Sequence, residues 1–308
     1  MGNVHARQYS GMEDVELAVF DRDSDRSQKA SSRWNAKSHA SLEDLMRAVD
    51  VVDICLPTDL HHQTGLAAIA AGRAVFMEKP MALTVEAAEE VVTAAAKANV
   101  PLMPGQVVRF FPEFAAGNRM VKNGKIGLPA AARTRRGGGA PQGTDQWFMD
   151  HSRSGGVLLD LAIHDFDWLR WTLGEVKQIY SRSVAIEKGS GPDYALSTLT
   201  FENGAVAHVE STWMDPCGYL RTAYEVAGSE GLIQFDSRDC PAIRSTAGKP
   251  EFPLARTDDP YYLELRGFLD SVTQGVPPPV TGEDGLAALR ISCAAIQSAK
   301  TGKLVRMG

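Results

Sequence analysis

Apolar segments of strand length alternate with helical segments over the first hundred residues, and this rhythm restricts the fold more than any other feature. Residues 51–57 are almost continuously apolar, which is typical of a parallel strand buried on both faces. A helical pattern over 62–72 leads to a second apolar run at 74–77, and a long Ala-rich helix over 84–99 leads to a strand over 101–108. This spacing predicts a parallel, doubly wound sheet.

The residues before this region fit the same class of fold. A short helix is expected at 3–9, a strand ending in an acid at 15–21, and a polar helix at 24–36. Ser41 followed by Asp44 resembles a capping box and predicts a helix that begins there and reaches Val49.

The pattern changes after residue 110. A helix is expected to 123, a Gly-rich loop at 137–139, and a single helix from about 156 to 173. Strand-like segments without intervening helices follow at 177–185, 194–201, 205–212, 222–227 and 232–236, with a hairpin signal at Glu202-Asn-Gly-Ala205, and two late helices are expected at 260–274 and 283–300. This predicts an α/β chain with an N-terminal Rossmann-type parallel sheet in residues 1–108. Residues 109–308 are predicted to form an α+β domain with a largely antiparallel open sheet.

Composition excludes several classes of function. The formal net charge of -6 and the absence of long basic runs argue against nucleic-acid binding. The densest basic cluster, 133–136, is predicted to be a solvated strand end or loop. No run has the length of a membrane span, and the first residues lack the apolar core of a signal peptide. The four cysteines form no CxxC pair, which favours reduced thiols, a cytoplasmic location and no metal site.

The apolar run at residues 74–77 is followed directly by two charged residues. After Met77 come Glu78, Lys79 and Pro80, and proline cannot continue a strand ladder. Open α/β sheets bind ligands at the carboxyl ends of their strands. The sequence therefore allows either a surface ion pair at a strand end or a catalytic lysine beside a nucleotide site.

The usual phosphate-binding fingerprint of such sheets is incomplete. Gly2 can be the third glycine of G-x-G-x-x-G, while the preceding strand and the first two glycines are absent, so either a misassigned start or weak NAD binding is expected. Asp21 has the position of the acid that binds ribose hydroxyls, which favours NAD, although Arg22 beside it leaves NADP open.

Two further segments carry candidate polar residues. Pro57, Thr58 and His61 follow a buried strand and form either a ligand loop or an ordinary helix start. Asp160 and His164 share a helix face at i, i+4 in apolar surroundings, as a structural hydrogen bond or as an acid–base site. A metal site at this pair would need ligands that no second cluster supplies.

Taken together, these motifs resemble the glucose–fructose oxidoreductase/inositol dehydrogenase/rhizopine-catabolism (Gfo/Idh/MocA) family of NAD(P)-dependent enzymes. The resemblance covers nearly the whole chain and rests on five motifs in order: Pro57-Thr-x-Leu-His61, Glu78-Lys-Pro80, Gly155-Gly…Asp160-x-x-x-His164-Asp165, Phe201-Glu-Asn-Gly-Ala205 and Thr281-Gly-Glu-Asp-Gly-Leu…Ser298-Ala-Lys-Thr-Gly302.

The resemblance implies reversible oxidation of a secondary alcohol on a sugar, a cyclitol or a related polyol. It implies that Lys79 lies near nicotinamide and substrate, that His164 is the acid–base, and that Asp160 positions substrate or tunes the site. The bond before Pro80 is expected to be cis. His164 can accept the hydroxyl proton while cationic Lys79 stabilises alkoxide charge.

The same resemblance implies which residues contact the cofactor and which surface forms an oligomer. Pro57, Thr58, His61 and Glu78 are expected on the cofactor side, and a homodimer or homotetramer is expected through the C-terminal sheet. Arg109 matches an Arg-Phe pair of the family, but Val107 replaces a common Asn, so Arg109 either contacts substrate or pairs with an acid. A non-catalytic ligand sensor or regulatory relative that retained the fold is the alternative function.

Overall fold

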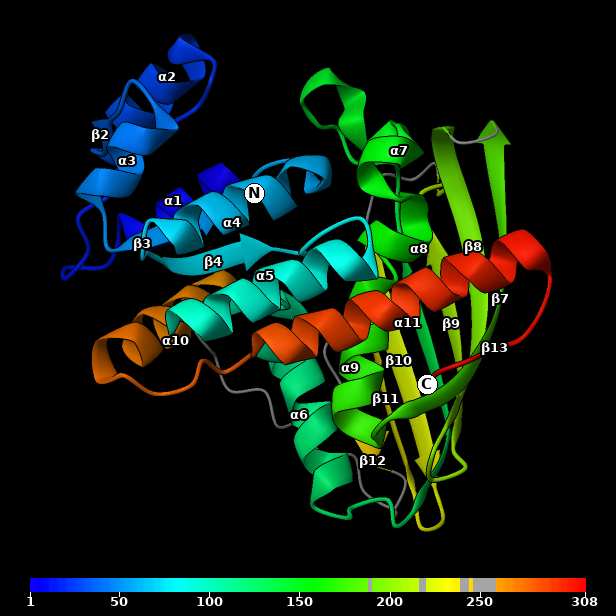
Figure 1. Ribbon diagram of the computed structural model, residues 1–308. Helices are drawn as coiled ribbons and strands as arrows, with labels where there is room; N and C mark the ends of the chain where they lie inside the picture. The colour runs from blue at the N-terminus through cyan, green and yellow to red at the C-terminus, as the bar shows by residue number, and fades with distance from the viewer. Residues whose placement is uncertain (188–189, 216–219, 239–243, 246–258) are drawn as a thin grey trace. The chain divides into compact units, whose positions relative to one another are not determined.

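The computed structural model describes residues 1–187, 190–215, 220–238, 244–245 and 259–308. These form two compact units, and the chain passes between them more than once (Figure 1). Unit 1 contains Met1–Ala82, Glu86–Val107 and Asp258–Gly285, and unit 2 contains most of the remaining chain. The expected boundary near 108 coincides with a change of unit, whereas the late segment 258–285 belongs to unit 1 and not to one continuous C-terminal block.

Unit 1 contains the predicted parallel strands. β3 (Val51–Ile54), β4 (Ala74–Glu78) and β5 (Leu102–Gly105) form a three-stranded parallel sheet in that order. β1 (Ala18–Val19) and β2 (Lys37–Ser38) form a parallel pair that is separate from this sheet. β1 is shorter than the strand predicted over 15–21, and the sequence pattern did not reveal β2.

The helices of unit 1 agree closely with the predicted ones. They are α1 (Gly2–Tyr9), α2 (Ser24–Trp34), α3 (Leu42–Ala48), α4 (His61–Ala70), α5 (Val85–Ala98) and α10 (Pro260–Gln274), with the 3₁₀ turn η1 (Thr58–Leu60). A second 3₁₀ turn, η2 (Val107–Phe110), begins at Val107 and continues into unit 2. The capping prediction is confirmed, because the Ser41 hydroxyl oxygen accepts a hydrogen bond from the Asp44 backbone N–H at 3.0 Å.

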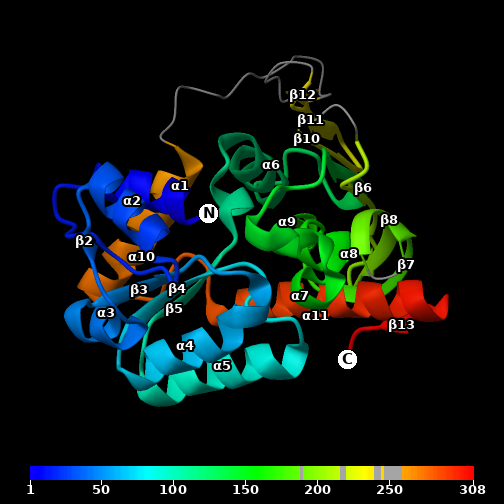
Figure 2. The same cartoon turned by 90° about the horizontal axis from the view of Figure 1, so that it is seen from above.

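Alternation of side chains along β4 explains how both faces of the small sheet are covered. The ring of Phe76 contacts His5 of α1 and Phe268 of α10, with centroid separations of 5.5 and 5.7 Å. Met77 points to the opposite face, where its methyl group lies so close to Gly65 of α4 that a Cβ there would be 2.3 Å away. Figure 2 accordingly shows α4 and α5 on one side of β3–β5 and α1 and α10 on the other. Every residue of β4 is buried, as the apolar run predicts.

Unit 2 is built on an eight-stranded mixed sheet. Its order is β12-β11-β10-β6-β9-β8-β7-β13, and its pairs are antiparallel except for β6 with β9. The strands are β6 (Pro129–Gly137), β7 (Val176–Glu187), β8 (Ser190–Phe201), β9 (Val206–Thr212), β10 (Arg221–Gly228), β11 (Leu232–Asp236), β12 (Arg244–Ser245) and β13 (Val305–Arg306). The largely antiparallel sheet and the hairpin between β8 and β9 are confirmed.

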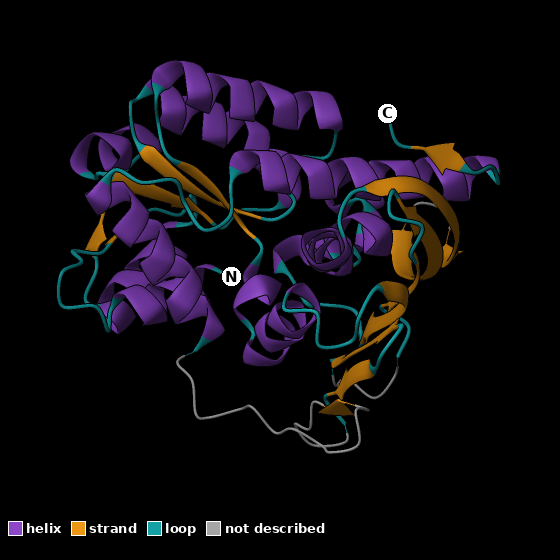
Figure 3. Cartoon of the chain, turned by 90° about the horizontal axis from the view of Figure 1, so that it is seen from below, coloured by secondary structure: helices purple, strands orange, loops and turns teal. Residues whose placement is uncertain are grey.

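Helices cover one face of this sheet (Figure 3). They include α6 (Pro112–Lys122), α7 (His151–Ser154), α8 (Gly156–Asp160), α9 (Ile163–Leu173) and the part of α11 (Gly282–Thr301) that belongs to unit 2, with the 3₁₀ segment η3 (Thr144–Met149). An aromatic cluster fills the centre, where Trp168 donates its indole N–H to the Phe114 carbonyl at 2.9 Å and stacks near Tyr224. Among the described residues, no helix combines the length and apolar character needed to cross a membrane.

Two predictions for unit 2 were wrong. The basic run 133–136 lies inside β6, between β10 and β9, and not in a solvated strand end or loop. Strand alternation turns Arg136 inward, where its side chain is 5% exposed and binds Asp165, which is fully buried. The single helix expected over 156–173 is two helices, because the backbone hydrogen bonding changes register between α8 and α9.

The inward arginine of β6 gives a stability prediction with a control on the same strand. Arg136→Met leaves the Asp165 carboxylate buried without its ion-pair partner, which typically costs about 3–5 kcal/mol. Arg133→Met removes a side chain that is 74% exposed and 4.0 Å from Glu225, which should cost less than about 1 kcal/mol. Urea denaturation of the two variants measures the difference, and similar midpoints would contradict the assigned role of Arg136.

Candidate functional site

The carboxyl end of β4 carries the charged residues that the sequence singled out. Glu78 is buried, and one carboxylate oxygen accepts a hydrogen bond from the Lys79 backbone N–H at 3.0 Å. The other oxygen lies 3.2 Å from His5 Nε2. Burial opposes ionisation of Glu78, but the hydrogen bond and charge of His5 outweigh it, and the pKa of Glu78 is lowered. The Lys79–Pro80 peptide bond is cis, as expected. Glu78 therefore shapes the Lys79 loop, and its direct contact with a cofactor stays a prediction.

His61 holds two strand-end loops together. The fully buried ring places Nδ1 2.7 Å from the Pro80 carbonyl oxygen and Nε2 2.8 Å from the Leu56 carbonyl oxygen. These carbonyls belong to the loops that follow β4 and β3. Burial lowers the pKa of His61 more than the two carbonyls raise it. A neutral ring carries one N–H, so it donates to one carbonyl at a time. His61 therefore joins the two loops, and its expected place on the cofactor side stays a prediction.

Two buried polar atoms at the same strand ends lack hydrogen-bond partners among the described residues. They are the Thr58 hydroxyl, which follows β3, and the Gln106 side-chain oxygen, which follows β5. Pro57 immediately precedes Thr58, and Thr58 is the first residue of the η1 turn. Buried polar atoms normally find a partner, so these two suit a polar ligand at the carboxyl edge of the sheet. Sequence reasoning found Thr58 but missed Gln106, whose position directly after the last parallel strand was the available signal.

The remaining candidates on the cofactor side lie at α1 and β1. Gly2 begins α1, a helix whose first residue has no side-chain cap and whose first turn has no acid. Free backbone N–H groups at such a helix end suit a phosphate. Asp21 follows β1, is 39% exposed and binds Arg26 at 3.0 Å, while Arg22 is exposed. These residues therefore fit a bound dinucleotide. Asp21 suits its ribose, the start of α1 suits its phosphates, and the unpartnered atoms of Thr58 and Gln106 suit its other polar groups.

In unit 2, Asp160 and His164 lie on either side of a break between helices. Asp160 ends α8 and is buried, and His164 is in the first turn of α9 and is partly exposed. The Ala162 N–H bonds to the carbonyl of Val157 five residues earlier, and His164 N–H bonds to the carbonyl of Leu161 three residues earlier. This change of register is a feature often found at functional sites. Asp160 and His164 thus belong to two helices instead of the single one that was expected, and their pairing stays a prediction.

Asp193 of β8 supports the segment that carries Asp160. Its Oδ2 accepts the Val157 backbone N–H at 2.9 Å, and a Cβ on Gly156 would approach the same oxygen to 2.8 Å. Gly156 has φ of +71°, so glycine fits both the conformation and the space. Burial raises the pKa of Asp193, and the nearby charge of Asp160 raises it further. Sequence reasoning missed Asp193, because it lies more than thirty residues away along the chain.

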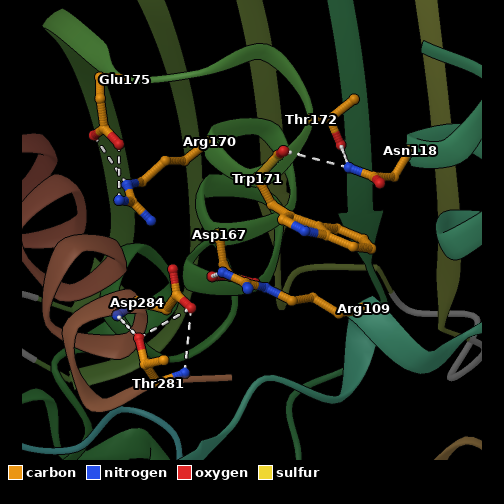
Figure 4. Close-up of polar contacts among 9 residues, drawn as sticks. All are labelled: Arg109, Asn118, Asp167, Arg170, Trp171, Thr172, Glu175, Thr281 and Asp284. Carbon is orange, nitrogen blue, oxygen red and sulfur yellow. Dashed lines mark hydrogen bonds and ion pairs between the residues drawn. The ribbon is translucent and has the colours of Figure 1, made fainter. Parts of the chain in front are cut away.

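Arg109 forms a buried ion pair with an acidic side chain. Its Nε and one terminal nitrogen bind the two carboxylate oxygens of Asp167 at 2.7 and 2.6 Å, and its guanidinium lies 5.4 Å from the centroid of the Trp171 ring. Figure 4 shows the two side chains directed toward each other. The geometry agrees with the interpretation of Arg109 as the partner of an acid, and its contact with substrate stays a prediction.

Comparison with protein-family models assigns both parts of the chain. Residues 1–106 match the model described as "Oxidoreductase family, NAD-binding Rossmann fold". Residues 114–234 match the model described as the "GFO/IDH/MocA C-terminal domain".

Named relatives align along most of the chain. The chain is 31% identical to the myo-inositol 2-dehydrogenase of Thermotoga maritima over 100% of this chain and 96% of the relative. It is 30% identical to an inositol 2-dehydrogenase of Rhizobium meliloti over 97% and 93%, respectively. Among solved structures, GenD2 from gentamicin A biosynthesis in complex with NAD has a TM-score of 0.89 at 25% identity, covering 100% of this chain and 93% of that chain.

The buried ring of His61 gives a pH prediction. Its folded-state pKa lies below the ordinary value near 6.5, so the unfolded chain takes up the proton first as pH falls through that value. The stabilising contribution is complete above about pH 7 and decreases on acidification, by at most about 1.4 kcal/mol per pH unit. Denaturation between pH 8 and 5 should show a smaller acid loss in His61→Gln than in the parent chain.

The neighbouring His62 supplies the control for that measurement. Its side chain is 22% exposed and binds Glu90 at 2.8 Å on the surface, outside the strand-end loops. His62→Gln should keep most of the acid sensitivity of the parent chain. Equal slopes for the parent and His61→Gln would show that the acid loss originates elsewhere.

Proposed function

Because the chain belongs to the GFO/IDH/MocA family of NAD-binding oxidoreductases, we propose that it interconverts a secondary alcohol and a ketone on a sugar, a cyclitol or a similar polyol. The observation that carries this proposal is the alignment of relatives named as inositol 2-dehydrogenases over nearly the whole chain. A 1,5-anhydro-D-fructose reductase of Ensifer adhaerens, 30% identical over 89% of the chain, extends the class of named substrates to sugars.

The proposed chemistry distributes its proton transfer and charge stabilisation over three side chains. His164 accepts the hydroxyl proton as the alcohol is oxidised, because an imidazole can take a proton near neutral pH. The Lys79 ammonium stabilises the developing alkoxide, and Asp160 orients the substrate hydroxyl or the imidazole. The buried position of Asp160 in α8 and the hydrogen bond from Val157 to Asp193 support a fixed geometry for this carboxylate.

NAD, when bound, supplies the hydride acceptor, and the protein supplies placement. Residues 1–108 are proposed to bind it through the Gly2 helix end, Asp21, Pro57 with Thr58, and the Glu78–Lys79 loop. The carboxylate of Asp21 repels a 2′-phosphate and favours NAD over NADP. His61 is proposed to act by positioning that loop. Arg109, which pairs with Asp167, is proposed to order the substrate region in residues 109–308.

A non-catalytic ligand sensor is not favoured as an alternative. The relatives described above carry names of dehydrogenases and reductases. A cytoplasmic location is proposed from the absence of paired cysteines in the sequence; Cys55 and Cys293 are free thiols, and Cys217 and Cys240 lie outside the described residues.

A homodimer or homotetramer through the unit 2 sheet completes the proposal. The face of the sheet opposite the helices carries exposed apolar side chains on three neighbouring strands, among them Val184 of β7, Leu196 of β8 and Val206 of β9. Charged residues such as Arg135 and Glu210, which lie 3.5 Å apart, border them. In the strand register Leu196 lies opposite Arg182 and Glu210, so this face mixes apolar and polar side chains, as many protein interfaces do.

Activity measurements test the proposed chemistry directly. NADH formation should be followed with the purified chain over inositols, aldoses and related polyols. His164→Ala should lower kcat by about 10²–10⁴, and Lys79→Ala by about 10²–10³, because each removes a group that acts in the transition state. Lys97→Ala, an exposed lysine of α5, should leave kcat unchanged. Full activity in a Lys79→Ala/His164→Ala double variant would refute the mechanism.

The interface proposal predicts a change of mass. Leu196 is 47% exposed on the outer face of β8, and Leu196→Glu places a charge in the proposed contact, which should shift the chain toward monomer in light scattering. Leu128→Glu is the control, since Leu128 is 80% exposed in the turn before β6. A parent chain that is monomeric, or a variant mass equal to that of the parent oligomer, would count against this surface.

A further inference from the structure

Four ionisable side chains meet in unit 1 on the face of the sheet that α1 covers. They come from α1, from the end of β3 and from the end of β4: His5, Asp53, Cys55 and Glu78. The proposed dehydrogenase mechanism uses only the last of these, and it uses that one as a loop residue. His5 is 48 positions from Asp53 and 50 from Cys55 along the chain, so its association with them arises only in the fold.

Strand geometry brings the ligands to one side. Asp53 and Cys55 are two positions apart at the end of β3, and side chains at i and i+2 of an extended strand point to the same face. Asp53 pairs with Phe76 in the parallel ladder, so Glu78 at the end of β4 belongs to that face too. His5 approaches from α1, where it is 1% exposed.

The distances describe a converging set of nitrogen, oxygen and sulfur atoms. His5 Nδ1 lies 2.8 Å from Asp53 Oδ2 and 3.2 Å from Cys55 Sγ. Cys55 Sγ lies 3.4 Å from Asp53 Oδ1. A tetrahedral zinc ion, with bonds of about 2.0–2.3 Å, separates its ligand atoms by roughly 3.3–3.6 Å. The His5–Asp53 contact would open by about half an ångström and the His5–Cys55 contact by a few tenths, while the sulfur lies near the other Asp53 oxygen, Oδ1.

The second nitrogen of His5 already has the partner that metal-bound histidines usually have. His5 Nε2 lies 3.2 Å from Glu78 Oε1, and the side chain of Glu78 is 9% exposed. A carboxylate that accepts the far N–H of a metal-bound imidazole fixes the ring and its tautomer. The arrangement thus supplies three ligands and a supporting carboxylate.

Charge balance agrees with a divalent ion. The cluster places the carboxylates of Asp53 and Glu78, which are 15% and 9% exposed, beside one imidazole, and the charges of Lys79 and the amino terminus also act on Glu78. Buried charges require paired opposite charges or a coordinated metal. A divalent ion bound by a neutral histidine, a carboxylate and a thiolate gives a neutral inner set.

We propose that His5 Nδ1, Asp53 and Cys55 form a binding site for a transition-metal ion of the zinc class, with Glu78 holding the His5 ring from its other side. The ion ties α1 to the end of β3 and leaves a fourth position for water or another ligand. The spacing of cysteines and histidines along the sequence gave no zinc signature, because the ligands come from elements joined only by the fold. Cobalt is a suitable probe because thiolate ligation gives it a strong charge-transfer absorption.

The test is a cobalt titration of metal-free full-length chain. The parent chain should bind one equivalent with a sulfur-to-cobalt charge-transfer band, and zinc should displace it and raise the melting temperature. Cys55→Ser should lose the band, and Asp53→Asn should bind more weakly by tenfold or more. Glu78→Gln should weaken binding by about 10–100-fold while the band persists.

Cys293→Ser is the matched control, since Cys293 is the other described free cysteine and lies on α11. It should keep the band and the affinity of the parent chain, and circular dichroism checks that each variant is folded. Three results would overturn the proposal: no stoichiometric cobalt binding by the parent chain, an unchanged band in Cys55→Ser, or loss of the band in Cys293→Ser.

Discussion

The compensation of buried charge at the end of β4 is the constraint on which unit 1 depends. Glu78 must be buried because the strand that delivers it is covered on both faces, and a buried carboxylate is stable only with partners. His5 of α1 and the Lys79 backbone N–H supply those partners. One side chain thereby fixes the packing of α1 and the conformation of the loop that presents Lys79. The Glu78 carboxylate therefore both stabilises the packing of unit 1 and positions the loop that carries the proposed catalytic lysine.

The sequence predicted the elements whose residues carry a strong local pattern. The alternation of apolar runs and helices located β3, β4 and β5, and Ser41 located the start of α3 through its cap. The five strands after α9 were found from alternation and the Asn203-Gly hairpin. The prediction for residues 133–136 of β6 was wrong, because the three arginines there were expected to be exposed to solvent. A mixed sheet tolerates that composition because outward positions are wet and the single inward one, Arg136, is neutralised by Asp165.

The candidate site was predictable only where its residues follow the ends of strands or belong to a family motif. Lys79, Thr58, Asp160 and His164 met one of these conditions. Asp193 acts through a contact between distant segments, so no spacing along the chain marks it, whereas Gln106 was missed although it directly follows β5. His61 was identified through a family motif, but its structural role follows from the two carbonyl oxygens that its ring contacts. Local patterns thus identify residues that face a ligand more readily than the residues that hold them.

Unit 2 provides rigid surroundings for the carboxylate and the imidazole that are proposed to carry the chemistry. α9 carries Asp165 and Asp167, and each is neutralised by a buried arginine, Arg136 in one case and Arg109 in the other. These ion pairs anchor α9 at two positions within one turn, and replacing either partner alone would leave a buried charge. His164 precedes both anchors on the same helix, next to the change in hydrogen-bond register that separates α9 from α8. His164 therefore belongs to a helix that buried ion pairs hold in place, and the general-base role proposed for it requires such a fixed position.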